Sequence, residues 1–285
     1  MENIEIIQAP IFGISRHRLT TDGRGVTTLV TFHGCTLRCK YCLNPQCLKS
    51  DKNILYYTPQ SLFDKVKKDD LYFRATGGGI TFGGGEPCLQ TDFILAFHRL
   101  CPSEWNLRLE TALNVSPDII DQLAPVIDEW IVDIKSLNPL IFKSYTGFDN
   151  TRRNASLERL LSIIPIDKIK LRIPIIPGYT TKEDAISDME QLKNRGFSRF
   201  DIFQYVTVKP THYSSLVPGL LPGKAKCEVM KRIRNIIAEA NGLDKSVHIC
   251  SHKGDCSGTC HLCEKELFDL TQAIYNKIKQ NQSIC

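Results

Sequence analysis

Three cysteines in one short run constrain this chain more than any other feature of its sequence. Cys35, Cys39 and Cys42 are separated by three and two residues, and residues 27–32 before them have the composition of a β-strand. Three thiolates on one loop can bind three irons of a cubane [4Fe–4S] cluster, because cysteine is the usual ligand of such clusters. The fourth iron of that cluster would be open to another ligand, so the run predicts a reactive cluster at the end of a strand.

Two basic residues, Arg38 and Lys40, stand among these cysteines. Positive charge beside a thiol favours the thiolate, which is the form that binds metal, so we expect lowered pKa values for the thiols. The spacing alone also allows a zinc knuckle or three unrelated buried thiols. A second motif is needed to decide between these interpretations.

A glycine-rich run at residues 77–87 supplies the second motif. Residues 80–82 predict a short strand that ends in Gly84, Gly85 and Glu86. No G-K-[ST] sequence follows, and no G-x-G-x-x-G precedes a helix, which argues against a phosphate loop. Glycines let the backbone approach a ligand closely, and Glu86 offers a carboxylate to an ammonium group.

Together the two motifs resemble the radical S-adenosylmethionine (SAM) enzymes. C-x3-C-x2-C with an aromatic residue before the third cysteine is the signature of that family, and a G-G-E segment follows it. The resemblance implies that SAM chelates the open iron, and that the reduced cluster splits SAM into methionine and a 5′-deoxyadenosyl radical. The residues that it places at SAM in these two motifs are Tyr41, Gly84, Gly85 and Glu86.

Strand and helix patterns alternate over most of the chain, as in a parallel α/β sheet. About six β/α units are too few for a closed eight-fold barrel, so we predict a partial (β/α)6 barrel, with functional groups at the C-terminal ends of its strands. The resemblance implies the same fold. The predicted strands are residues 27–32, 80–82, 107–110, 130–134, 170–175 and 200–206. Predicted helices begin at residues 58–60 and 116–117 and span residues 91–100, 139–145, 155–164, 181–195 and 225–240.

Charged residues at these strand ends resemble motifs of the family's glycyl-radical-enzyme activating enzymes, such as the pyruvate formate-lyase activating enzyme. The resemblance implies that Glu110, Thr111 and Asp133 bind a monovalent cation beside SAM. It also implies that Lys135 faces SAM and that Arg172 reaches the SAM carboxylate. Taken singly, each of these residues is equally a strand-end charge in solvent, but three such motifs at strand ends favour function.

The sequence departs from the activating enzymes at three places. Arg24 replaces the proline of their D-G-P-G segment, and Leu43 replaces the histidine of their H-N-P triplet. Activating enzymes also carry a histidine near the end of the last strand, beside the adenosine of SAM. Residues 202–206 contain no histidine, and His212 comes several residues later, so the resemblance does not specify the adenosine contacts.

The composition changes beyond Gly242, which predicts a radical SAM core at residues 1–242 and a cysteine-rich extension at residues 243–285 with a terminal helix at 264–280. Four cysteines of the extension can complete a closed site, either a second [4Fe–4S] cluster or a structural zinc. They do not suit the SAM cluster, because no barrel follows them. These cysteines are Cys250, Cys256, Cys260 and Cys263, and the alternative ligands are His248, His252 and His261.

The remaining features describe the setting. Twelve cysteines argue for metal binding in a reducing compartment, and the first ten residues lack the pattern of a signal peptide. No apolar stretch is long enough to span a membrane. The net charge is +5, but the basic residues form no block of the kind that binds nucleic acid. We therefore expect a cytoplasmic monomer. Three further thiols are interpreted as unligated: Cys47 as a spare thiol, Cys88 as a buried apolar residue and Cys285 as a free terminal thiol.

The resemblance favours an activase that takes a hydrogen atom from a glycine of a glycyl radical enzyme, with electrons from a flavodoxin- or ferredoxin-type donor. A second hypothesis within radical SAM chemistry is a maturase that modifies a precursor peptide or small molecule with help from the auxiliary cluster. A third is a non-catalytic iron–sulfur or zinc protein. The third explains the cysteines, but it does not explain the G-G-E segment or Asp133-x-Lys135.

Overall fold

We describe the protein from a computed structural model. The structure describes residues 7–19, 22–49, 54–207, 223–244 and 260–280. The chain divides into two compact units. Unit 1 comprises Met1–Ile14, Leu29–Lys65 and Ile80–Lys209, and unit 2 comprises Ser15–Thr28, Val66–Gly79 and Pro210–Cys285. Each unit is described by itself.

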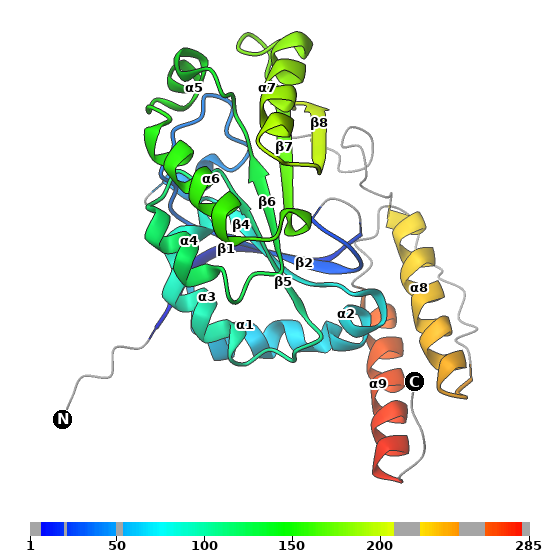
Figure 1. The fold of residues 1–285 in the computed structure, drawn as a ribbon. Coiled ribbons are helices and arrows are strands. Elements are labelled where there is room, and N and C mark those ends of the chain that lie inside the picture. Colours follow the sequence, from blue (N-terminus) through cyan, green and yellow to red (C-terminus); the bar gives the residue numbers. More distant parts are fainter. Residues whose placement is uncertain (1–6, 20–21, 50–53, 208–222, 245–259, 281–285) are drawn as a thin grey trace, which may run out of the picture. The chain divides into compact units, whose positions relative to one another are not determined.

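The described strands form one open eight-stranded sheet (Figure 1). β5 to β8 pair in parallel, and β1 pairs with β3 in antiparallel. The α/β class and the open sheet predicted from the sequence are confirmed, and the six predicted strands are neighbours in chain order. In sheet order the strands are β3 (Leu55–Tyr57), β1 (Ala9–Arg18), β2 (Thr27–Phe32), β4 (Gly79–Gly84), β5 (Asn106–Thr111), β6 (Glu129–Asp133), β7 (Ile169–Ile175) and β8 (Phe200–Gln204).

The helices of unit 1 alternate with its strands, and local signals mark where they begin and end. Thr181 and Asp184 form a capping box at the start of α7, the Asn138 side chain caps α5, and Gly147 ends α5 at a φ of 83°. Figure 1 shows α3, α4 and α6 packed side by side. The helices are α1 (Pro59–Val66), α3 (Thr91–His98), α4 (Pro117–Leu123), α5 (Pro139–Thr146), α6 (Thr151–Ile163) and α7 (Lys182–Asn194).

The core of unit 1 lies between the sheet and these helices. Phe82 of β4 stacks on Phe32 of β2 with ring centroids 5.5 Å apart, and Phe97 of α3 meets Phe82 edge-on at 5.6 Å. All three rings are fully buried. Strands buried on both faces have nearly continuous apolar sequences, which is why the sequence located them well.

Strands β1 and β3 and helix α2 (Asp70–Thr76) were not predicted from the sequence. The sequence analysis predicts no strand at residues 9–18, yet they form β1, which pairs with the short β3. Thr31 of β2 donates a hydrogen bond to the Gly13 carbonyl at 2.9 Å, and a Cβ at Gly13 would lie 2.7 Å from that hydroxyl. These contacts come from distant residues, so periodicity within residues 9–18 does not reveal the strand.

Unit 2 is built from helices α2 (Asp70–Thr76), α8 (Gly223–Ala240) and α9 (His261–Lys279). Figure 1 shows α8 and α9 side by side, and Tyr72, Met230 and Leu267 form a buried apolar cluster with Val26. The helices predicted at 225–240 and 264–280 are confirmed. The domain boundary at residue 242 stays a prediction.

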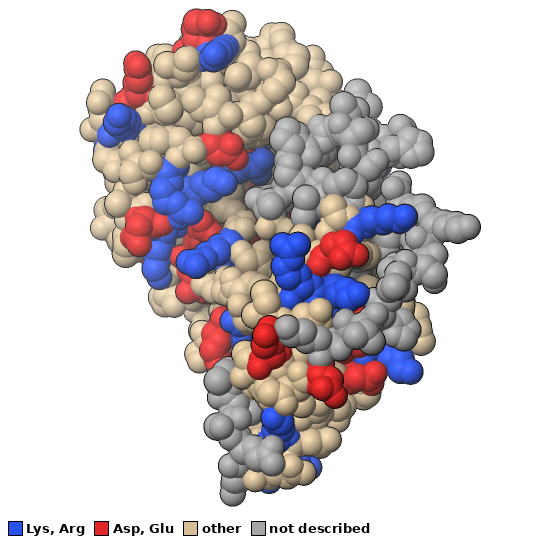
Figure 2. Space-filling model, turned by 90° about the vertical axis from the view of Figure 1, so that its right-hand side faces the viewer, with Lys and Arg blue, Asp and Glu red and all other residues tan. Residues whose placement is uncertain are grey.

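Among the helices that the structure describes, none has the length and apolarity needed to cross a membrane. On the face in Figure 2, the basic side chains lie among acidic ones. This mixture agrees with the modest net charge of +5.

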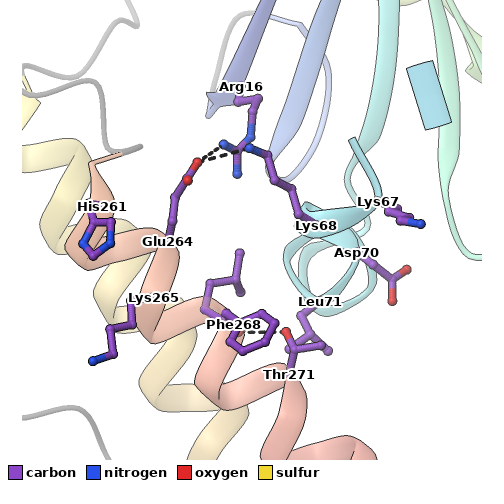
Figure 3. A pocket seen from close by; sticks show the side chains of 11 residues that line it. Arg16, Lys67, Lys68, Asp70, Leu71, His261, Glu264, Lys265, Phe268 and Thr271 are labelled. Carbon is purple, nitrogen blue, oxygen red and sulfur yellow. Dashed lines mark hydrogen bonds and ion pairs between the residues drawn. The ribbon is translucent and has the colours of Figure 1, made fainter. Parts of the chain in front are cut away.

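A buried ion network organises unit 2. Arg16 donates to both carboxylate oxygens of Asp69, at 2.7 and 2.6 Å, and His17 Nε2 lies 2.9 Å from Asp69 Oδ1. Arg16 also pairs with Glu264 of α9, and Lys68 reaches the same carboxylate at 3.2 Å. Figure 3 shows Arg16, Lys68 and Glu264 at a pocket of about 370 Å³ that Leu71, Phe268 and Thr271 also line.

Stability should therefore depend on pH through Asp69. Burial alone would raise the pKa of this carboxyl group, but Arg16 and His17 lower it to about 2. Because an unfolded aspartate titrates near 3.9, the folded state gains about 2–3 kcal/mol at neutral pH, and this gain disappears as the pH falls from about 5 towards 2. Denaturant unfolding followed by circular dichroism should show a shallower acid dependence in Asp69→Asn.

Asp70→Asn is the matched control for this experiment. Asp70 pairs with Arg74 on the partly exposed surface of α2, where ion pairs contribute about 0–1 kcal/mol. Equal acid profiles for wild type and Asp69→Asn would contradict the assignment of the acid transition to Asp69.

Candidate active site

The loop that carries the three cysteines, residues 34–42, is called the cysteine loop. Two segments that are distant in the sequence hold it in place, one on each side. Its first residue, Gly34, accepts a hydrogen bond from Glu86 N at 2.8 Å, and Gly85 N donates to the Phe32 carbonyl at 3.0 Å. On the other side, Arg38 N donates to the Thr146 carbonyl at the end of α5, at 2.9 Å. The G-G-E segment after β4 therefore lies directly against the start of the loop, as the two motifs predicted.

The three thiols are half-buried, and each has a different neighbour. Glu86 has the largest charge effect on the pKa of Cys35, whereas Cys39 interacts with Lys135 and Cys42 with Cys47. Burial raises the pKa of Cys35 to about 11 and also raises the pKa of Cys39, where the opposing effect of Lys135 is smaller. The thiols of the loop therefore interact with the Glu86 carboxylate and the Lys135 amine, which follow strands β4 and β6.

The pKa lowering expected from Arg38 and Lys40 was wrong for Cys35 and Cys39, because both thiols have raised pKa values. The Arg38 guanidinium donates to the Cys35 and Leu37 carbonyls at 2.8 and 2.9 Å, so it stabilises the turn of the loop. Lys40 is exposed. At Cys39 the cation that lowers the pKa is Lys135, which follows β6 in the chain.

Glu86 is almost completely buried, at 1% exposure, and joins the ends of β4 and β5. Its carboxylate accepts hydrogen bonds from Cys88 N at 3.2 Å, Thr111 Oγ1 at 2.7 Å and Ala112 N at 3.1 Å. An ionised carboxylate has about four acceptor positions. The Cys88 side chain is a fourth hydrogen-bond partner of this carboxylate. The expected hydrogen bond from the ammonium group of SAM to Glu86 stays a prediction.

Glu86→Gln should weaken SAM binding. The amide of glutamine carries no charge and replaces one acceptor oxygen by a donor that would face Thr111 or Ala112. Losing a charge-assisted hydrogen bond costs about 1.5–3 kcal/mol, so we expect a 10- to 100-fold higher Kd for SAM by isothermal titration of the cluster-loaded protein. Glu110→Gln is the control for loss of a neighbouring carboxylate. An unchanged Kd in a folded Glu86→Gln variant would assign Glu86 a structural role only.

The charged strand-end residues lie mainly on one face of the sheet. Asp133 lies opposite Arg172 in the parallel register, and Arg172 lies opposite Asp201. Arg172 is 3.7 Å from Glu110 and 3.5 Å from Asp201, and Lys135 is 2.8 Å from Asp133 Oδ2. Burial would raise the pKa of Asp133, but Lys135 and Arg172 hold it below its usual value. The predicted grouping of these charges at the strand ends is present.

Thr111 does not share this face. It follows Glu110 directly in β5, and successive strand residues point to opposite faces. Its hydroxyl donates to Glu86, and Leu113 N donates to that hydroxyl at 2.9 Å. A monovalent-cation site that combines Glu110, Thr111 and Asp133 stays a prediction.

An aromatic cluster beside the loop was missed by sequence reasoning. Tyr205 comes directly after β8, and its hydroxyl donates to the Tyr41 carbonyl at 2.9 Å. Lys135 Nζ lies 5.8 Å from the centre of the Tyr205 ring. Tyr145 and Tyr179 pack edge-on at 5.0 Å, and Tyr179 also meets the Tyr41 ring at 5.9 Å. Tyr205 thus stands where the sequence lacks the expected histidine.

Two buried polar atoms near the loop fit the binding of a polar cofactor. Thr36 Oγ1 and Asp133 Oδ1 are buried, and neither has a hydrogen-bond partner in the described part of the chain. Buried polar atoms are normally paired. Together with the three thiols, these two atoms suit an iron–sulfur cluster that carries an amino-acid ligand.

The structure describes only two of the four cysteines predicted to form a metal site in the C-terminal extension, Cys260 and Cys263. Cys250, Cys256, His248 and His252 lie outside the described residues, as do His212 and Cys285. Cys263 packs against Cys227 of α8, with Cys260 beside them, and sequence reasoning had not singled out Cys227. Within the described ranges, no group of three or more His, Cys, Asp or Glu residues is arranged to hold one metal ion.

Comparisons with known proteins place the chain in a family. The sequence model of the Radical SAM superfamily matches residues 29–190, more than half of the 285 residues. The chain is 26% identical over 235 residues to the pyruvate formate-lyase 1-activating enzyme of Escherichia coli (strain K12), which covers 77% of this chain and 92% of that protein. It is 26% identical over 246 residues to the indoleacetate decarboxylase activating enzyme of Tractidigestivibacter scatoligenes, covering 63% of this chain and 77% of that protein.

Among solved structures, Streptococcus suis SuiB aligns with a TM-score of 0.46 and 14% identity over 77% of this chain. The chain spans about half of the SuiB chain, 48% of its length. The matched residues 29–190 include the cysteine loop, the G-G-E segment and the strand-end charges Glu110, Asp133, Lys135 and Arg172. The chain belongs to the Radical SAM superfamily.

Proposed function

We propose that this radical SAM enzyme activates a glycyl radical enzyme by removing a hydrogen atom from a glycine Cα of that partner. The observation that carries the proposal is the contact between the cysteine loop and the G-G-E segment, made by the 2.8 Å hydrogen bond from Glu86 N to the Gly34 carbonyl. Relatives named as activating enzymes support the partner class, including those of pyruvate formate-lyase and indoleacetate decarboxylase.

In this proposal Cys35, Cys39 and Cys42 hold three irons of the cluster. Glu86 accepts a hydrogen bond from the amino group of SAM, while Gly84 and Gly85 let the backbone approach the ligand. When bound, the reduced cluster supplies one electron that splits SAM into methionine and a 5′-deoxyadenosyl radical, which takes the hydrogen atom. Arg172 and Lys135 provide positive charge for the carboxylate of SAM, and Tyr41 contributes its loop carbonyl, fixed by Tyr205.

The proposal divides the chain into a core of residues 1–242 and an extension of residues 243–285. It also places a monovalent cation at Glu110, Thr111 and Asp133 and an auxiliary metal site in the extension. That site is a second [4Fe–4S] cluster or a zinc ion. It also includes a flavodoxin- or ferredoxin-type electron donor and a cytoplasmic, monomeric enzyme. The ligands proposed for the auxiliary site are Cys250, Cys256, Cys260 and Cys263.

Isotope transfer tests the substrate. The reduced, cluster-loaded protein is mixed with SAM and with pyruvate formate-lyase in which every glycine carries two deuterons on Cα. We expect a glycyl radical signal on the partner by electron paramagnetic resonance and one deuterium in the 5′-deoxyadenosine. Because this partner is a probe from a relative, glycyl radical enzymes encoded beside the gene are tested in the same way.

A peptide maturase is the alternative, and the cysteines of the extension favour it. It predicts deuterium transfer from a labelled precursor peptide encoded near the gene and no glycyl radical on any of the enzymes tested. Formation of 5′-deoxyadenosine with transfer only from the peptide would overturn the activase proposal.

A further inference from the structure

Two buried charged side chains of unit 1 have no role in the proposed reaction, yet both contact the segment that follows β6. Arg153 of α6 is fully buried, and Asp188 of α7 is 6% exposed. Arg153 Nη2 donates a hydrogen bond to the Ser136 carbonyl at 2.9 Å. Asp188 Oδ2 accepts a hydrogen bond from Leu137 N at 3.0 Å. Side chains from two helices therefore hold consecutive backbone groups of this segment.

Neighbouring polar side chains complete this set of contacts. Asn150, at the start of α6, is buried, and its side-chain amide donates to the Leu137 carbonyl at 3.2 Å. The Ser136 hydroxyl accepts a hydrogen bond from Asn138 N at 3.1 Å, and the Asn138 side chain caps α5. The backbone of residues 136–138 is therefore fixed by side chains from α6, from α7 and from the segment itself.

Stability alone does not explain a charged residue at position 153. Nε and Nη1 of Arg153 are buried and have no hydrogen-bond partner in the part of the chain that the structure describes, and the guanidinium carbon lies 5.1 Å from the centre of the Phe142 ring. Unpaired buried polar atoms destabilise a fold, and apolar residues often replace buried charges without loss of stability. Buried polar networks instead specify one conformation of the segment that they contact. Here that segment is residues 136–138.

Lys135 immediately precedes this segment. Its Nζ lies 2.8 Å from Asp133 Oδ2 and 5.8 Å from the centre of the Tyr205 ring. On the other side of Lys135, Ile134 N donates to the Arg172 carbonyl at 2.8 Å, which continues the pairing of β6 with β7. A lysine side chain carries a point charge on a flexible four-carbon stem. The position of its ammonium group therefore depends on how firmly the backbone is held on both sides.

We propose that Arg153, Asn150 and Asp188 are positioning residues that hold Lys135 where its ammonium group pairs with the carboxylate of SAM. They act through the backbone of residues 136–138 and not by contacting SAM. A binding site keeps its geometry only when packing and hydrogen bonds support the side chains that form it. This inference rests on the proposed function, in which Lys135 provides positive charge for SAM.

A double-mutant cycle on SAM affinity tests the inference. In isothermal titrations of the cluster-loaded protein, Asp188→Ala removes the acceptor of Leu137 N and should raise the Kd for SAM by about fivefold to tenfold. Lys135→Met removes the charge and should raise the Kd at least as much. The double variant should have the Kd of Lys135→Met, because a displaced backbone has no further effect once the charge is absent.

Two further variants separate positioning from stability. Asp188→Asn keeps an acceptor oxygen for Leu137 N and should bind SAM as the wild type does. Ser156→Ala is the matched control, because the buried Ser156 hydroxyl of α6 donates to the Val115 carbonyl at 2.7 Å, outside residues 136–138. This variant should lower the free energy of unfolding and leave the Kd unchanged. Additive effects in the cycle, or an equal rise of the Kd in Ser156→Ala, would overturn the inference.

Hydrogen exchange of the metal-free protein is a readout that needs neither the cluster nor SAM. Peptides that contain residues 136–138 should exchange faster in Asp188→Ala than in the wild type, and at the wild-type rate in Ser156→Ala. If Asp188→Ala does not fold, Asn150→Ala replaces it in both experiments. Wild-type exchange of these peptides in the variant would contradict the network.

The titrations also distinguish this inference from the proposed function. A cluster-loaded wild type that binds no SAM, or a Lys135→Met variant that binds SAM normally, would overturn the proposed role of Lys135 and this inference with it. A raised Kd in Lys135→Met beside an unchanged Kd in Asp188→Ala would overturn this inference alone.

Discussion

Cys35→Ala, Cys39→Ala and Cys42→Ala should each abolish formation of 5′-deoxyadenosine from SAM by the reduced protein. In the proposed site each thiolate binds a different iron, so two thiolates cannot hold the cluster in its reactive form. Anaerobic reconstitution, reduction and chromatography of the products measure this effect. Cys101→Ala, whose thiol contacts the Phe97 carbonyl away from the loop, should keep wild-type production.

The three variants also test the assignment of each cysteine as a cluster ligand. Near-normal production of 5′-deoxyadenosine by any one of them would remove that cysteine from the cluster. The result is most informative at Cys42, because Cys47 forms a side-chain hydrogen bond with Cys42 and can replace it as an iron ligand. A double variant, Cys42→Ala with Cys47→Ala, separates replacement by Cys47 from a wrong assignment of Cys42.

Gly85→Ala should have the second largest effect. A Cβ at this position would lie 2.0 Å from the Gly34 carbonyl oxygen and 2.9 Å from the Phe32 carbonyl oxygen. Both are backbone atoms, so the cysteine loop and the G-G-E segment would have to separate, breaking the 2.8 Å hydrogen bond from Glu86 N to Gly34. We expect a loss of about 3 kcal/mol in the free energy of unfolding, at the upper end of overpacking costs, and at least tenfold weaker SAM binding.

Gly83→Ala, in β4 two residues before Gly85, is the matched control. Its Cβ would lie 3.1 Å from Glu110 Oε2 and 3.3 Å from Glu110 Cβ, with no backbone atom among its three nearest neighbours. We expect this variant to lose less than about 1 kcal/mol. Chemical unfolding and calorimetric SAM titration compare the two variants, and equal losses would show that the contact between the motifs is not what makes Gly85 necessary.

The strands of the sheet were predictable because burial shapes their sequences. Residues 130–134 are a mostly apolar run, and residues 170–173 alternate polar with apolar residues. β6 and β7 begin and end within one residue of the predicted ranges 130–134 and 170–175. Helix starts followed from caps such as Thr181 and from prolines such as Pro117 in the first turn. β1 has a mixed sequence and depends on β2 and β3 as partners, so its own residues carried too little information.

The site was predictable where a motif encodes it locally, and not where distant segments meet. The cysteine run and the G-G-E segment were recognised, and the structure places them in contact. The neighbours that determine their chemistry come from other elements. Lys135 is the cation at Cys39, Tyr205 holds the Tyr41 carbonyl, and Cys47 contacts Cys42. Sequence spacing cannot show which side chains meet across a sheet.

The most direct test of this account is whether the wild-type protein cleaves SAM reductively. The anaerobically reconstituted protein is reduced, mixed with SAM in the absence of any partner, and assayed for 5′-deoxyadenosine and methionine. We expect the two products in equal amounts, dependent on reduction and lost in Cys39→Ala. A protein that carries a reduced [4Fe–4S] cluster and binds SAM, yet forms neither product, would contradict the assignment of the cysteine loop, Glu86 and Lys135 to a radical SAM centre.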